Sequence, residues 1–177
     1  VPLHIACKNE GITPSMIKLL LRVWPECAHQ QNHYLALPLH ILCMDERDEE
    51  VAIDILKLLL KAHPGSVSET DDEGHLPLHF AAYNKSSAFC KVLVDAYPES
   101  VKSLNGDGEL PFHLACDHGR LETVEYLFGL YPESLHIRNY DGYLPIHCSA
   151  NSPGDNTAEI IEFLLLHDPE CLSKPVL

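Results

Sequence analysis

The sequence repeats one tripeptide motif, and this repetition limits the fold more than any other feature. Its prolines are 36, 39, 34 and 34 residues apart. A period of about 20–50 residues indicates a stack of similar units, because one unit cannot bury its apolar side alone. Such stacks usually present binding surfaces rather than catalytic pockets. The five copies are Pro2-Leu3-His4, Pro38-Leu39-His40, Pro77-Leu78-His79, Pro111-Phe112-His113 and Pro145-Ile146-His147.

A second motif follows each tripeptide at 21 to 26 residues and contains a proline, usually between an aromatic residue and a glutamate. A residue before proline avoids the α conformation, so each copy is expected to end a helix. The copies are Trp24-Pro25-Glu26, His63-Pro64-Gly65, Tyr97-Pro98-Glu99, Tyr131-Pro132-Glu133 and Asp168-Pro169-Glu170.

The fourth unit shows the expected local structure most clearly. Residues 105–108 are Asn-Gly-Asp-Gly, which is typical of a tight turn. Pro111 suits a helix start, and Gly119 is expected to end that short helix. Residues 121–130 carry an apolar stripe at helical spacing, which predicts a second helix. Each unit is therefore predicted to be a turn followed by two helices.

The composition argues against a membrane-spanning protein and against nucleic acid or lipid as a partner. The chain has 177 residues with a net charge of −14 and no apolar run long enough to cross a membrane. An acidic surface repels nucleic-acid phosphates and anionic lipids, so we expect neither as a partner. The charge suits a basic protein partner, although it is equally explained by solubility. The chain begins inside a unit, which suggests a fragment.

The seven cysteines do not resemble a disulfide framework, because their number is odd and none form a C-x-x-C pair. Cysteine exchanges with alanine in the slot three residues after the motif histidine, and with serine after the second motif. This is typical of reduced, buried cysteine and favours an intracellular, cytoplasmic location. The slots hold Cys7, Cys43, Ala82, Cys116 and Ala150, and Cys27, Ser66, Ser100, Ser134 and Cys171.

The pattern resembles the ankyrin repeat. The match lies in the turn, the Pro-Leu-His helix start, the small residues that follow, the glycine and the Leu-x-x-Val-x-x-Leu helix, seen best over residues 108–128. Two features depart from the family pattern. Leucine replaces the threonine before the proline, as at Leu110, and removes a hydroxyl bond to the histidine. Leu35 stands where later copies have glycine, so the hairpin before Pro38 is expected not to take the same left-handed conformation easily.

Histidine and cysteine at i, i+3, as in His113 and Cys116, have the spacing of two metal ligands or of a nucleophile and its base. Successive pairs would be separated by on the order of 10 Å, too far to share a zinc ion. Two copies also lack the cysteine. We therefore expect no metal, no cofactor and no catalysis, and predict that each motif histidine bonds backbone in its own or the adjacent unit.

The units differ in length at one point, between their two helices, where residues 11–14, 45–49 and 152–155 are added. The acidic stretch 45–50 is either a docking element for a basic ligand or a solvated loop before a helix N-terminus.

We therefore predict an all-α, slightly curved solenoid of about five turn-helix-helix repeats with short hairpin turns. It would form one domain over 1–177, with repeats at 1–31 (partial), 32–70, 71–104, 105–138 and 139–177. By resemblance to ankyrin arrays, a monomeric array would bind another protein, presenting basic and apolar groups, through its concave groove. The alternatives are a spacer within a longer protein, an enzyme joined to the array, and binding at the insertion edge. The expected contacts are His33, Tyr34, Met44, Asp72, Glu73, His75, Tyr83, Asn84, Asp107, Glu109, Asp117, His118, Tyr140, Asp141 and Tyr143.

Overall fold

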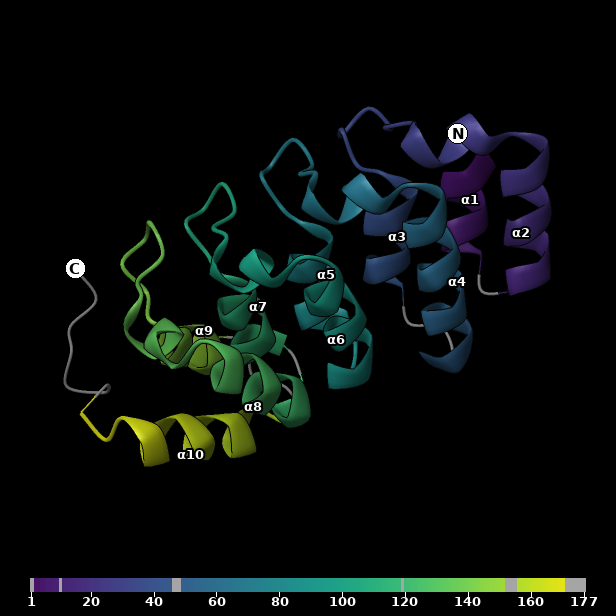
Figure 1. Cartoon of the computed structure of the whole chain (residues 1–177). Coiled ribbons are helices and arrows are strands. Elements are labelled where there is room, and N and C mark those ends of the chain that lie inside the picture. Colours follow the sequence, from purple (N-terminus) through teal and green to yellow (C-terminus); the bar gives the residue numbers. More distant parts are fainter. Residues whose placement is uncertain (1, 10, 46–48, 119, 152–155, 171–177) are drawn as a thin grey trace.

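The protein is a stack of helix pairs (Figure 1). The computed structural model describes residues 2–9, 11–45, 49–118, 120–151 and 156–170. Within them, ten α-helices form five consecutive pairs and no strand occurs. The first helices are α1 (Pro2–Lys8), α3 (Pro38–Met44), α5 (Pro77–Asn84), α7 (Pro111–His118) and α9 (Pro145–Asn151). The second helices are α2 (Pro14–Val23), α4 (Glu49–Ala62), α6 (Ser87–Ala96), α8 (Leu121–Leu130) and α10 (Thr157–His167).

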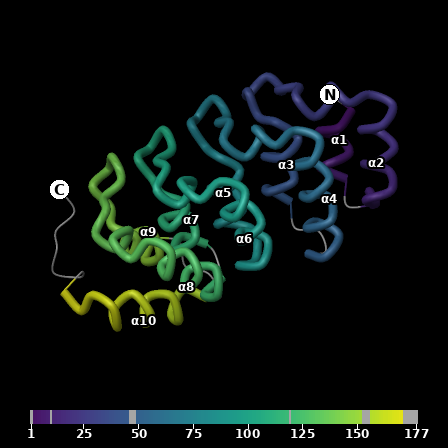
Figure 2. The backbone as a smooth tube through the Cα atoms, in the orientation of Figure 1, coloured from purple at the N-terminus to yellow at the C-terminus, as the bar shows by residue number. Residues whose placement is uncertain are grey.

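The first and second helices form two layers. Each first helix contacts the first helix of the next pair, and α2, α4, α6 and α8 contact one another in the same order. The hairpins project from one edge of the stack, and the stack curves along its length (Figure 2). The prediction of an all-helical, curved solenoid is confirmed.

Proline determines where each first helix begins. Pro38 and Pro77 occupy the first helical turn, where the missing N–H removes no helical hydrogen bond. The second helix of the fourth pair spans Leu121–Leu130, as the apolar stripe predicts. Gly119, the expected end of α7, and residues 46–48 and 152–155 of the expected insertions lie outside the described residues.

The second motif forms a short 3-10 helix after each of the first four second helices. Tyr97 leaves the helical conformation with φ −146° and ψ 85°, which ends α6. In the last three of these segments, a serine donates its hydroxyl to the carbonyl of the residue before proline, at 2.6 Å for Ser100 and Tyr97. These segments are η1 (Pro25–His29), η2 (Pro64–Ser68), η3 (Pro98–Lys102) and η4 (Pro132–His136).

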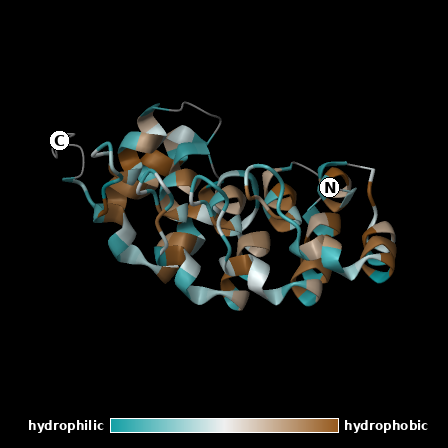
Figure 3. Ribbon diagram, turned by 90° about the horizontal axis from the view of Figure 1, so that it is seen from above, coloured by the Kyte–Doolittle hydropathy of each residue, from teal (hydrophilic) through white to brown (hydrophobic). Residues whose placement is uncertain are grey.

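The core runs continuously through all five pairs, since the buried apolar residues of neighbouring pairs form one cluster. Figure 3 shows the apolar residues concentrated on the helices and the polar residues in the hairpins. Members such as Leu39, Ile55, Phe89, Phe112 and Leu164 are at most 2% exposed.

The hairpin before Pro38 corrects one expectation. Leu35 has φ 55°, in the same left-handed region as Gly74, Gly108 and Gly142 at 75–82°. Leu35 therefore takes the left-handed conformation of the later glycines, contrary to the expectation that leucine would not adopt it easily. Leucine accepts a conformation that it intrinsically disfavours because the surrounding hydrogen bonds require it.

No described helix combines the length and the apolar character that crossing a membrane requires.

Candidate functional site

Each hairpin is closed by one side-chain oxygen at its first position. Asn105 Oδ1 accepts the backbone N–H groups of Asp107 at 3.0 Å and Glu109 at 2.8 Å. Asp71 and Asn139 occupy the same position, and each closes its hairpin through Oδ1. Asn32 makes the equivalent bonds at 2.9 and 3.1 Å, so it holds Leu35 in place. These side chains fix the shape of the tips that would meet a partner.

Neighbouring hairpins are joined by backbone hydrogen bonds. Asp72 N donates to Tyr34 O at 3.0 Å, Gly106 N to Glu73 O at 2.8 Å, and Tyr140 N to Asp107 O at 2.9 Å. The approach is close at Gly106, where a Cβ would lie 2.5 Å from Glu73 O. The tips therefore form one continuous edge rather than independent loops.

The motif histidines join each repeat to the next. In His79, Nδ1 accepts the N–H of Leu76 at 2.9 Å, so the proton sits on Nε2. Nε2 then donates to Ser103 O at the end of its own unit and to Glu109 O of the following unit, both at 3.2 Å. His40 makes the equivalent set of contacts, and His113 reaches Ile137 O, at the end of its own unit, at 3.0 Å. The structure thus has the expected bonds to both its own and the adjacent unit.

Burial keeps these histidines neutral. It lowers the pKa of His40, His79 and His113 to about 4, and hydrogen bonds to backbone only partly oppose this. Because both ring nitrogens of His79 hold backbone partners, a metal would have to displace them.

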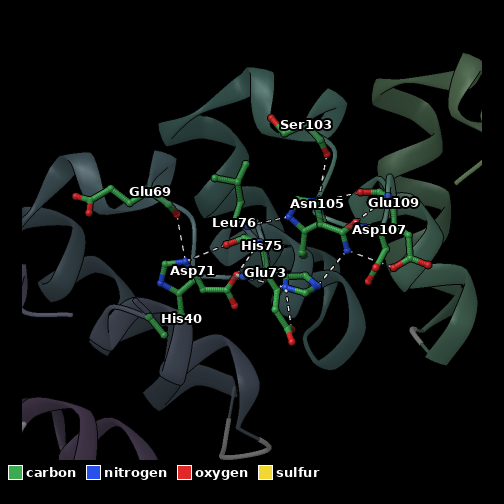
Figure 4. Close-up of polar contacts among 12 residues, drawn as sticks. His40, Glu69, Asp71, Glu73, His75, Leu76, Ser103, Asn105, Asp107 and Glu109 are labelled. Carbon is green, nitrogen blue, oxygen red and sulfur yellow. Dashed lines mark hydrogen bonds and ion pairs between the residues drawn. The ribbon is translucent and has the colours of Figure 1, made fainter. Parts of the chain in front are cut away.

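His75 is part of a polar network across two hairpins (Figure 4). The amide of Asn105 donates to His75 Nε2 at 3.0 Å, because Oδ1 of Asn105 is already occupied by backbone N–H groups. The proton of the neutral ring therefore lies on Nδ1, facing Asp71 Oδ1 at 3.4 Å and Glu73 Oε2 at 3.7 Å. These three groups are close enough to suggest a cation site. However, a metal at Nδ1 would have to displace that proton.

A hollow of about 480 Å³, named here the concave hollow, lies between the first helices and the hairpins of the first three repeats. Apolar side chains stay exposed in it: Ile5 by 70%, Tyr34 by 57% and Met44 by 38%. Its lining also includes three carboxylates, all from the hairpin that begins at Asp71, and one lysine, Lys8. The residues that line it are His4, Ile5, Lys8, Asn32, Tyr34, Ala36, Ile41, Met44, Asp71, Asp72, Glu73 and Phe80.

Comparison with protein families decides what kind of array this is. The family model described as ankyrin repeats (3 copies) matches residues 3–103 and 49–133. The chain belongs to the ankyrin-repeat family. A search of curated proteins finds no match. Ankyrin repeats are in general modules for protein–protein interaction and in general are not catalytic.

The ankyrin array brings some of the expected contact residues together and separates others. Tyr34, Met44, Asp72 and Glu73 share the concave hollow. Three others line a polar hollow of about 310 Å³, where the rings of Tyr83 and His118 stack at 4.9 Å between centroids. The residues of that polar hollow are Glu49, Tyr83, Asn84, Lys85, His118, Arg120 and Asn156.

The remaining expected contacts lie mostly at exposed positions. Tyr140 is 73% exposed and its ring covers Gly108, where a Cβ would lie 2.5 Å from the ring. His75 differs from the expectation, because it is only 9% exposed and its ring belongs to the hairpin network. Exposed or half-buried are His33, Asp107, Glu109, Asp117, Asp141 and Tyr143.

The sequence analysis missed the apolar residues of the concave hollow. Ile5, Ile41 and Phe80 line it, and each directly follows a motif histidine. The signal was present in the sequence, because every repeat carries an apolar residue or cysteine there. That position was not singled out, since the sequence pattern of a two-turn helix is too short to separate a buried side from a concave one.

The acidic stretch 45–50 is attached to the next repeat at both described ends. Lys85 is 1% exposed and its ammonium group bonds Asp45 Oδ1 at 3.0 Å, while Ser86 donates to Glu49 Oε1 at 2.5 Å. Residues 46–48 lie outside the described part of the chain. Asp45 and Glu49 thus have structural partners, whichever role the middle of the stretch has.

The buried cysteines have no sign of reactivity. Burial raises the pKa of Cys43 and of Cys116 well above that of a free thiol. Cys116 and Ala82 occupy the same slot and are 1% and 0% exposed. Cysteine therefore behaves as a small core residue at this position, and Cys171 lies outside the described residues.

Proposed function

We propose that this ankyrin array recognises a protein partner through its concave surface, with the hollow of the first three repeats as the centre of the contact. The observation that carries this proposal is the exposure of Ile5, Tyr34 and Met44 together in one hollow. Apolar and aromatic side chains grouped in a concavity are typical of binding sites, because their burial stabilises a complex at low entropic cost.

The partner that fits this hollow carries basic and apolar groups. Asp72 and Glu73 are exposed at its rim and attract lysine or arginine, while the apolar floor takes an aliphatic or aromatic side chain. Asp107, Glu109, Asp141 and Tyr143 extend the acidic and aromatic surface along the later hairpins. The array acts as a monomer inside the cell, without catalysis and without binding nucleic acid or membrane.

A peptide library displayed on phage, selected on the immobilised 177-residue chain, tests this proposal. We expect enrichment of peptides that combine lysine or arginine with bulky apolar residues. Tyr34→Ala and Met44→Gln should each weaken binding of the selected peptides by about tenfold, as measured by titration calorimetry.

The matched control is Leu130→Gln, because Leu130 is 44% exposed but lies on an outer helix. It should leave affinity unchanged. If binding survives Tyr34→Ala and Met44→Gln but is lost when residues 45–50 are deleted, the insertion edge is the binding face. If no selected peptide binds, the array is a spacer.

A further inference from the structure

The outer surface of the first two repeats carries a concentration of positive charge. Lys18 and Arg22 lie four residues apart on α2, and Lys57 and Lys61 lie four residues apart on α4. Residues at this spacing share one side of a helix, and α2 packs against α4. All four side chains are exposed. They represent a third of the 12 lysines and arginines of the chain.

Lys18, Lys57 and Lys61 line a hollow between the two helices, and Arg22 lines a second hollow beside it. The first hollow measures about 370 Å³, and its apolar lining includes Leu58. The second is smaller, about 210 Å³, and lies on α2, where Leu19 is 50% exposed. Among the residues that line the two hollows, Asp54 is the one acid. The two sets are Pro14, Ser15, Lys18, Asp54, Lys57, Leu58 and Lys61, and Ser15, Lys18, Leu19 and Arg22.

The equivalent surface of the later repeats has lost this charge. The position of Lys57 is held by Lys91 in α6, but Lys91 pairs with Asp95 at 3.3 Å, four residues on. In α8 the same two positions are Glu125 and Gly129. In the described part of the chain, none of the four basic residues of α2 and α4 takes part in a recorded ion pair.

We propose that this basic face, defined as Lys18, Arg22, Lys57 and Lys61 around Leu58, is a second docking surface, which binds an acidic polypeptide segment with apolar side chains. Carboxylates of the segment pair with the four cations, and one apolar side chain enters the hollow over Leu58. Arg22 and Lys61 stand in the last turns of their helices, where they also stabilise the helix dipole. Lys18 and Lys57 stand earlier, so that role does not account for them.

Charge complementarity favours a polypeptide segment over a lipid surface. An anionic membrane is an extended plane, so it faces the charge of the whole molecule as well as the basic face. Because that net charge is −14, the membrane is repelled. A short acidic segment interacts within about 8–10 Å, the screening distance at physiological salt, and so meets mainly the basic face. The surface lies on the outer helices, away from the concave hollow, so the array has two surfaces of opposite charge and could hold two partners at once.

A labelled synthetic peptide tests this surface directly. The probe is a ten-residue peptide of glutamate and leucine, EELLEELLEE, and binding is followed by fluorescence anisotropy at about 50 and 200 mM salt. We expect binding that weakens at the higher salt. Lys57→Gln should weaken it about threefold, and the triple variant Lys18→Gln, Lys57→Gln, Lys61→Gln by tenfold or more. Leu58→Gln tests the apolar contact and should also weaken binding, with a thermal melt to confirm that the variant is folded.

Lys91→Gln is the matched control, since Lys91 occupies the same position of its repeat as Lys57 but lies outside the basic face. It should leave the affinity unchanged. Equal affinities for the triple variant and the parent chain would overturn the proposal, as would equal losses from Lys57→Gln and Lys91→Gln or no binding of the peptide at all. Sedimentation of the chain with phosphatidylserine vesicles, but no binding of the peptide, would show that the face is a membrane surface instead.

Discussion

The junction between the first two repeats and the junctions farther along the array are built alike, from a motif histidine and a hairpin. They differ in the hydrogen bonds of the histidine and in the residue on which the hairpin turns. In the interior, His79 bonds one backbone N–H and two carbonyls and is 0% exposed. At the first junction, His4 reaches Ala36 O at 2.8 Å and is 7% exposed. The hairpin there also turns on Leu35, where the later hairpins have glycine. Equal backbone geometry therefore does not imply equal stability, and the first junction should be the weaker one.

Acidification should produce the largest effect, because it acts on the interior histidines together. Their folded pKa of about 4 lies below the unfolded value of 6.5, so they stabilise the fold fully above pH 6.5. As the pH falls from 6.5 towards 4, the unfolded chain binds protons that the folded chain cannot. With three such groups, the free energy of unfolding should fall by up to about 4 kcal/mol per pH unit within this window.

Urea unfolding at pH 7.5, 6.5 and 5.5 measures this dependence. His113→Ala provides the control, because it removes one of the three groups and should reduce the slope by about a third. Identical unfolding midpoints at pH 7.5 and 5.5 would mean that the interior histidines are not held neutral.

Removing single histidines should separate the two kinds of junction. His113→Ala leaves Leu110 N–H and Ile137 O without their partner inside the fold and should cost about 1–3 kcal/mol. His4→Ala should cost less, about 1 kcal/mol. Chemical denaturation of both variants at pH 7.5 gives the comparison, and equal losses would remove the distinction between junctions. Zinc or EDTA should not shift the melting temperature, and a clear shift would indicate a metal role for these histidines.

The hairpins should respond in opposite directions to changes at their left-handed residue. Gly108→Ala places a Cβ at φ +75° and against the Tyr140 ring, and should destabilise by about 1–2 kcal/mol. Leu35→Gly relieves the same strain at the first junction, although glycine adds freedom to the unfolded chain, so the net gain should be up to about 1 kcal/mol. Thermal and urea unfolding should show these opposite signs. A loss of stability in Leu35→Gly would mean that the leucine side chain stabilises the fold by more than its left-handed backbone conformation destabilises it.

The fold could be predicted because the signals repeat. Five copies of the Pro-x-His motif predicted the start of each first helix, and the residue before the second proline predicted the end of each second helix. The outcome at Leu35 could not be predicted from local preference, because bonds from Asn32 and from the next hairpin override it. Prediction of the site was less complete. Exposed tips such as Tyr34 were identified, but His75 is buried and bonded to Asn105, thirty residues later in the chain, which local sequence does not show.

Substitution of the cysteine three residues after the motif histidine should have the smallest effect on stability, because this position is equally buried along the array. Cys43 and Cys116 are 0% and 1% exposed, and Ala82 fills the same slot at 0%. Cys43→Ala and Cys116→Ala should therefore cost similar amounts, at most about 1.5 kcal/mol, since each removes one small buried atom from an otherwise unchanged contact. Reductant should leave the melting temperature unchanged, and a thiol reagent should react with Cys116 only as fast as the chain opens, because burial keeps that thiol protonated. If Cys43→Ala cost far more than Cys116→Ala, the packing of the first helices would itself differ along the array, and the weaker first junction could no longer be attributed to its histidine and its hairpin alone.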